Sequence, residues 1–196
     1  DVLSLVKSFH PELVIMNYST FSSSEDCHIA QTIKSTIDTS LYLVGASCQC
    51  VNLDQLMIDN PKIDGAIRGE FDYTALDLAN DVPKREIKGL TWRQRRKIIH
   101  NPSRSPVTSE QLDEFPFVTD VYRRHLNLKK YRQAPQLWPF VDMFTGRSCS
   151  WNQCIFCLWA YTINKGVPYR TRNIRSVIEE IIFVQKNLPF VKEIFI

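Results

Sequence analysis

Short apolar runs alternate with amphipathic stretches over the first 80 residues. The runs at 13–16, 41–44 and 65–68 are brief and mostly aliphatic, which is typical of strands buried in a parallel sheet. Around them, the spacing of apolar positions predicts helices over residues 2–9, 26–36, 53–58 and 74–78. Strands that alternate with helices in this way indicate an open α/β sheet.

Polar and small residues follow each of these strands. Ligands of open α/β sheets bind at the carboxyl ends of the strands. In this chain those ends are Ser19–Phe21, Gly45–Ser47 and Gly69–Glu70. We therefore expect a ligand site of this region to lie along that edge of the sheet.

The pattern changes beyond residue 80. Residues 87–92 predict an edge strand, and the basic run 93–97 predicts a hairpin turn. The charges of this run are typical of a solvated face, with a phosphate or nucleic-acid contact as the alternative. Residues 100–136 are proline-rich and aperiodic, which predicts a linker with short helical pieces.

A second α/β unit is predicted after this linker. An apolar run begins at Leu137, the amphipathic helix 176–187 follows, and the alternating stretch 191–196 reads as a strand. The chain is thus predicted to hold one domain over 1–99, the linker 100–136 and a second, truncated domain over 137–196. It opens without Met and ends within a strand pattern, so we interpret it as an internal fragment.

Composition narrows the class of protein. Hydrophobic residues make up 44% and charged residues 23% of the 196 residues, which is ordinary for a globular protein. The net charge of +3 gives no argument for nucleic acid, and no apolar run is long enough to span a bilayer. Because the six cysteines cluster rather than pair at regular spacing, we expect metal ligation in a reducing cytoplasm.

The cluster of cysteines is the strongest chemical signal. Cys149, Cys154 and Cys157 fall within nine residues of a loop that follows Gly146. Three thiolates can hold one metal centre and leave one coordination site open for a ligand. The alternatives are ordinary buried thiols, a zinc site, which prefers two pairs of ligands, and a plant-type [2Fe–2S] site, which needs a fourth cysteine.

The stretch from Gly146 to Trp159 resembles the cluster loop of radical S-adenosylmethionine (SAM) enzymes. The family pattern is C-x3-C-x-aromatic-C, and this chain keeps the aromatic residue as Phe156 but has four residues between Cys149 and Cys154. Together with residues 169–172 and 191–196, the stretch is similar to the cobalamin-dependent branch, including relatives linked to hopanoid biosynthesis. The resemblance implies a [4Fe–4S] cluster on the three cysteines, with SAM on its open iron, Phe156 near the adenine, and one-electron cleavage of SAM to a 5′-deoxyadenosyl radical.

Residues 1–80 resemble the cobalamin (B12)-binding domain of the same family. The resemblance implies a flavodoxin-like (Rossmann-like) α/β domain without its first strand, followed by the first βαβ unit of a partial (β/α) radical SAM barrel. Ser19 and Gly45 match positions that line the nucleotide tail of cobalamin, and Gly69 and Glu70 match a stretch near the last strand. The family's cobalt-ligating histidine would lie upstream of residue 1.

The resemblance implies a radical SAM enzyme that transfers a methyl group or modifies a carbon skeleton. Its partners would be a small-molecule substrate and an external electron donor of the ferredoxin or flavodoxin type, without nucleic acid. The alternatives are a non-catalytic iron–sulfur electron carrier or sensor, and a zinc-stabilised nucleic-acid-binding module. We predict buried thiols at Cys27, Cys48 and Cys50, and structural ion pairs for Arg170 and Arg172.

Overall fold

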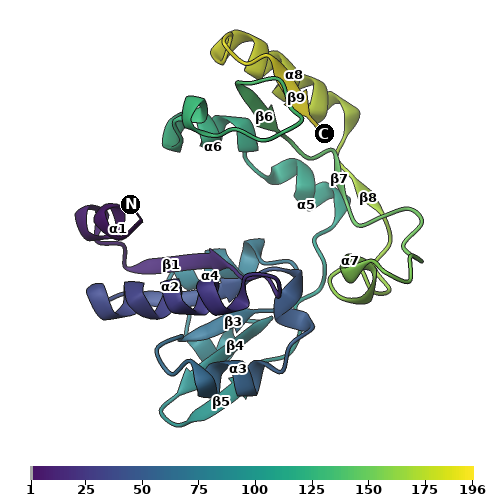
Figure 1. Ribbon diagram of the computed structural model, residues 1–196. Coiled ribbons are helices and arrows are strands. Elements are labelled where there is room, and N and C mark those ends of the chain that lie inside the picture. The colour runs from purple at the N-terminus through teal and green to yellow at the C-terminus, as the bar shows by residue number, and fades with distance from the viewer. Residues whose placement is uncertain (1) are drawn as a thin grey trace. The chain divides into compact units, whose positions relative to one another are not determined.

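The computed structural model describes residues 2–196, which fall into two compact units (Figure 1). The first unit runs to Pro106 and also includes Trp151–Val167. The second unit comprises Val107–Ser150 and Pro168–Ile196. The predicted domain boundaries at 99 and 136 stay predictions.

The first unit is built on a five-stranded sheet in the order β1-β2-β3-β4-β5. Its first three strands run parallel, as predicted, and the last two are antiparallel. The strands are β1 Leu13–Asn17, β2 Ser40–Val44, β3 Gly65–Ile67, β4 Leu90–Gln94 and β5 Lys97–His100. The hairpin at the basic run is confirmed. The prediction of an edge strand at 87–92 is wrong, because β5 pairs with the outer side of β4.

Helices cover both faces of this sheet because β2 is apolar on both sides. Leu41 and Leu43 pack in one core with residues of α2 and α3, whereas Tyr42 and Val44 pack in another with Leu78 of α4. Figure 1 shows α2 lying along the sheet close to β1. The helices of this unit are α1 Val2–Phe9, α2 Ser23–Thr36, η1 Ala46–Gln49, α3 Leu53–Asp59, α4 Asp72–Ala79, η2 Lys84–Glu86 and α7 Leu158–Tyr161.

The second unit contains the predicted strand–helix–strand arrangement. Strand β6, Phe140–Asp142, pairs in parallel with β9, Glu193–Phe195, and α8, Ile174–Asn187, precedes β9 in the chain. Val141, Val184, Leu188 and Leu128 form its core. The remaining elements are α5 Ser109–Glu114, α6 Val118–His125, η3 Leu128–Lys130, β7 Gly146–Arg147 and β8 Arg170–Thr171.

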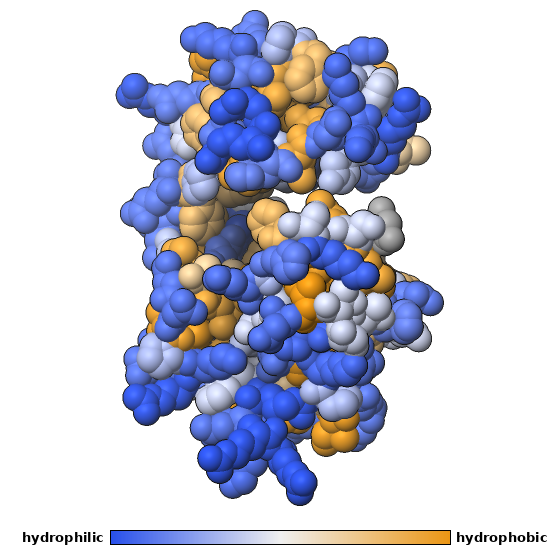
Figure 2. Space-filling model, turned by 90° about the vertical axis from the view of Figure 1, so that its left-hand side faces the viewer, coloured by the Kyte–Doolittle hydropathy of each residue, from blue (hydrophilic) through white to orange (hydrophobic). Residues whose placement is uncertain are grey.

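The surface is mostly polar. On the face drawn in Figure 2, hydrophilic side chains predominate and apolar side chains form separate patches between them. Among residues 2–196, none of the helices combines the length and the apolar character that crossing a membrane requires.

Candidate functional site

The cysteine loop is closed at its base by a short ribbon. Strand β7 pairs antiparallel with β8, so that Gly146 lies opposite Thr171 and Arg147 opposite Arg170. The 22 residues between these strands, 148–169, therefore form a loop whose two ends lie side by side. Gly146 is required by this pairing, because a Cβ at that position would lie 2.5 Å from the carbonyl oxygen of Arg170.

All three predicted metal ligands lie on this loop, and none of them is in a disulfide. Cys149 is exposed, and Cys154 and Cys157 are half-buried. Within residues 2–196 there is no group of three His, Cys, Asp or Glu residues gathered closely enough to hold a metal ion. The three-thiolate site therefore stays a prediction.

The chemistry of the loop suits a soft metal centre. Three cysteines of one irregular segment, none in a disulfide, are the kind of donor set that iron–sulfur clusters use. The amide of Cys157 donates to the carbonyl of Cys154 at 3.2 Å, which forms a turn with Phe156 inside it. The Phe156 side chain is 87% exposed, so it is free to contact a ligand beside the thiols.

The second half of the loop packs within the first unit. Asn152 donates through Nδ2 to the carbonyl of buried Asn164 at 2.6 Å, which closes the segment on itself. The helix α7 contacts η1, which follows the carboxyl end of β2. The residues after Cys154 thus come beside the edge of the sheet where sequence analysis places a ligand site.

The four predicted cobalamin-site residues all lie at this carboxyl edge. Ser19 follows β1, Gly45 follows β2, and Gly69 and Glu70 follow β3. Gly45 has a φ of +117°, and a Cβ there would lie 2.8 Å from Oδ1 of Asn17, so this tight turn needs glycine. The Ser19 hydroxyl is engaged locally, since its Oγ accepts from the amide of Phe21 at 3.3 Å.

Two of these four residues line a cavity. Gly69 and Glu70 contribute to a space of about 530 Å³, which lies within the size range of small-molecule pockets. Gly69 has a φ of +78° with open space where a Cβ would stand, so its backbone is accessible from the cavity. The other lining residues are Cys48, Gln49, Arg68, Ser103, Arg104, Pro106, Ile163, Lys165, Gly166 and Val167. Ser19 and Gly45 are not among them.

The cavity is mainly cationic. It is lined by Arg68, Arg104 and Lys165, against one carboxylate, Glu70. Burial lowers the pKa of Arg68, whose guanidinium donates to the carbonyl of Asn101 while its Nε has no hydrogen-bond partner. An anionic group, such as a phosphate, is the ligand chemistry that this lining favours.

Cys27, Cys48 and Cys50, which lie outside the cysteine loop, are not ligand candidates of the same kind. Cys48 is fully buried and Cys27 nearly so, which confirms the prediction for these two thiols. Burial raises the pKa of Cys48 to about 12 and also raises the pKa of Cys27. The prediction for Cys50 is wrong, because the short helix η1 ends there and leaves the side chain exposed.

Arg170 and Arg172, which follow the cysteine loop in the chain, are buried and make structural contacts. Arg172 forms an ion pair with Glu180 at 2.5 Å, and both residues are buried, which confirms the predicted structural role. Arg170 is also buried and donates to the carbonyl of Val107. Sequence analysis overlooked Glu180, although it lies on the same helical stripe as Val177 and Val184, three residues after one and four before the other.

Comparisons with known proteins find a likeness in structure but none in sequence. No family model matches the chain, and no curated protein does. A solved structure of the radical S-adenosylmethionine methyltransferase TsrM from Kitasatospora setae, with cobalamin and a [4Fe-4S] cluster bound, matches with a TM-score of 0.60 and 16% identity. The match covers 96% of this chain and 39% of that chain, so this chain spans well under half of its length. The likeness confirms the predicted α/β fold class.

Proposed function

We propose that this chain is part of a cobalamin-dependent radical SAM enzyme, with methyl transfer as the favoured reaction class. The observation that carries the proposal is the loop of three cysteines, none in a disulfide, that follows strand β6 of a parallel β6–α8–β9 unit. Catalytic groups of β/α barrels lie at this end of their strands. The likeness to TsrM, a methyltransferase with the same two cofactors, favours this reaction class over others.

The cysteine loop and the cavity of the first unit would have different tasks. Cys149, Cys154 and Cys157 would hold the [4Fe–4S] cluster, and the exposed ring of Phe156 would pack against the adenine of SAM. When bound, the cluster supplies the electron that cleaves SAM, and cobalamin supplies a carrier for a methyl group. The loop's own share is to place SAM beside the thiolates and to shield it from water.

The cavity at the carboxyl edge of the first unit would take the phosphodiester of cobalamin, with Arg68 and Lys165 supplying positive charge around it, while Arg104 is paired with Asp77. Ser19 and Gly45, which the resemblance assigns to the nucleotide tail, lie outside this cavity, so the rest of the tail would extend toward them. The open backbone at Gly69 allows a ligand to approach closely. An external electron donor and a small-molecule substrate complete the proposed reaction.

Anaerobic reconstitution with iron and sulfide tests the enzyme reading. We expect the reduced protein to give an electron paramagnetic resonance (EPR) signal of a [4Fe–4S] cluster that shifts when SAM is added. An iron–sulfur signal that ignores SAM would instead indicate an electron carrier or sensor. One tightly bound zinc without a visible chromophore would indicate a zinc-stabilised module. For the cobalamin site, retention of a corrinoid by the native-length protein is the corresponding measurement.

A further inference from the structure

The base of the cysteine loop is fastened by a buried ion pair. The backbone amide of Arg172 donates to the carbonyl of Thr145 at 2.8 Å, which extends the β7–β8 ribbon by one bond. The Arg172 side chain turns back and donates through Nη1 to the carbonyl of Phe144 at 2.9 Å. Arg172, which directly follows β8, therefore holds the residues that directly precede β7 with both its backbone and its side chain.

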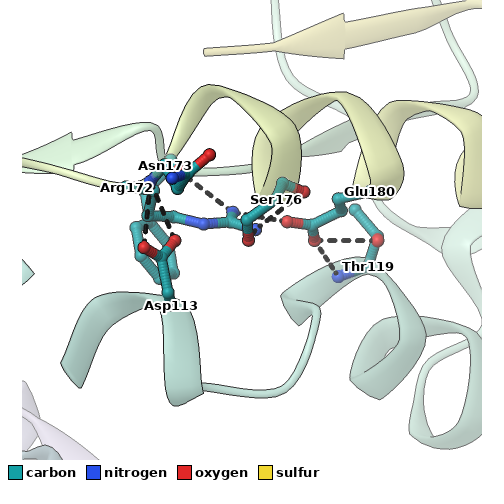
Figure 3. Close-up of polar contacts among 7 residues, drawn as sticks. Asp113, Thr119, Arg172, Asn173, Ser176 and Glu180 are labelled. Atoms are coloured by element: carbon teal, nitrogen blue, oxygen red, sulfur yellow. Dashed lines mark hydrogen bonds and ion pairs between the residues drawn. The ribbon is translucent and has the colours of Figure 1, made fainter. Parts of the chain in front are cut away.

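The guanidinium is held in place from the other side by Glu180. Its Nη1 lies 2.5 Å from Oε2 of Glu180, and its Nη2 donates to the hydroxyl of Ser176 at 2.9 Å. Figure 3 shows the arginine side chain lying along the first turns of α8 between Ser176 and Glu180. The rings of Phe144 and Phe117 flank it, with centroids 5.2 and 5.9 Å from the guanidinium carbon.

The second carboxylate oxygen of Glu180 links this pair to another helix. Its Oε1 accepts from the backbone amide of Thr119 at 3.1 Å and from the Thr119 hydroxyl at 2.9 Å (Figure 3). Glu180 has no exposed surface, and its carboxylate accepts three hydrogen bonds from charged or polar donors. A buried carboxylate so fully paired has one defined position, and it fixes the arginine with it.

A second carboxylate secures the exit strand one residue further along. Asp113 of α5 accepts from the backbone amide of Asn173 through both oxygens, at 2.9 and 3.1 Å. The Asn173 side chain in turn caps α8 by accepting from the amide of Arg175 at 2.9 Å. The start of α8 and the end of the loop are thereby held as one piece.

We propose that the Arg172–Glu180 pair is a positioning element that closes the base of the cysteine loop and sets the geometry in which its thiols are presented. The second part of this role, which sets the geometry of the thiols, rests on the proposed function, in which the thiols are cluster ligands. The pair acts through the carbonyl of Phe144, and the backbone amide of Arg172 holds that of Thr145; both residues directly precede the ribbon from which the loop departs.

The same helix offers a matched control. Arg175 and Glu179 form an ion pair at 2.9 Å, one residue before Glu180, but their side chains are 87% and 52% exposed. Glu180→Gln and Glu179→Gln remove the same charge from adjacent positions, one buried and one solvated. Glu180→Gln leaves the buried guanidinium of Arg172 without its counter-charge, whereas the Arg175 guanidinium that Glu179→Gln leaves is solvated.

Hydrogen–deuterium exchange of the chain without cofactors tests the closure. In Glu180→Gln we expect the amides around 145–147 and 170–172 to exchange at least about tenfold faster, while Glu179→Gln matches the unsubstituted protein. The double variant Arg172→Met with Glu180→Leu removes both charges and guards against simple unfolding. It should keep the amides of residues 182–187 protected and still exchange faster at the ribbon. Unchanged exchange at the ribbon in both variants would overturn the proposal.

The reconstituted native-length protein tests the positioning. We expect Glu180→Gln and the double variant to bind iron but to lose at least about half of the SAM-induced shift of the EPR signal, with Glu179→Gln unaffected. If the ribbon amides exchange faster but the SAM-induced shift of the EPR signal is unchanged, the positioning role is overturned. If the unsubstituted protein takes up no cluster, the proposed function and the positioning role both fail, whereas the exchange experiment still decides on the closure.

Discussion

Cys48 and Cys157 carry the same thiol in opposite surroundings. Cys48 lies fully buried in the core between α2, α3 and the sheet, whereas Cys157 lies half-buried on an irregular loop. A buried thiol without a cationic neighbour keeps its proton and serves as a small apolar side chain. An accessible thiol can lose its proton to a metal. The comparison shows that the fold, and not the number of cysteines, decides which of them are available for chemistry.

The largest difference between the cysteines of the loop and the other cysteines should appear in iron binding. Replacing Cys157 by Ser removes one of three proposed ligands, so we expect iron uptake on anaerobic reconstitution to fall at least about tenfold. Cys50→Ser, an exposed cysteine of the first unit, is the matched control and should bind iron like the unsubstituted protein. Full iron content with a SAM-sensitive EPR signal in Cys157→Ser would exclude this cysteine as a ligand.

The next largest difference between buried and accessible cysteines should appear in their rates of alkylation. The pKa of Cys48 is raised to about 12 by burial, compared with roughly 8.5 for an ordinary thiol, so its thiolate fraction at pH 8 is lower by about 10³-fold. We expect iodoacetamide to modify Cys48 slower than exposed Cys50 by at least this factor. The Cys48 rate should keep rising with pH between 9 and 11, where an ordinary thiol is already ionised. Mass spectrometry of quenched samples gives both rates, and equal rates would contradict the buried assignment.

The smallest difference should appear in stability. Cys48→Ser places a hydroxyl in a fully buried apolar site, which should lower the free energy of unfolding by about 1–3 kcal/mol. Cys50→Ser should change it by less than about 0.5 kcal/mol, because that side chain is exposed. Urea denaturation followed by circular dichroism measures both. A loss for Cys50→Ser as large as that for Cys48→Ser would mean that η1 is packed differently.

Much of the first unit was predictable because its strands are buried on both faces. β2 is an unbroken apolar run, so its neighbours, its parallel pairing and the ligand-binding edge after it follow from the sequence. The position of β4 did not follow. Its partner β5, Lys97–His100, is short and begins and ends with a basic residue, so only the turn between the strands was clear.

The sequence identified the candidate loop but not the residues that hold its base. The spacing of the cysteines identifies the loop, because only a few chemistries need three thiols so close together. The burial of Glu180 could not be expected from its residue type, since isolated glutamates are almost never fully buried. It depends on Arg172 and Thr119, which are 8 and 61 residues away and supply its hydrogen bonds. Such pairing is decided by tertiary structure.

The β7–β8 ribbon at the base of the loop holds the two ends of the loop together. Residues 146–147 and 170–171 are paired across the 22 residues that separate them. Between Cys149 and Cys154, Asn152 lies in the left-handed region at a φ of +45°, which asparagine tolerates better than most residues. For protein engineering, we expect changes of cysteine spacing to be tolerated best between Cys149 and Cys154, because residues 158–167 pack within the first unit and several of them line its cavity.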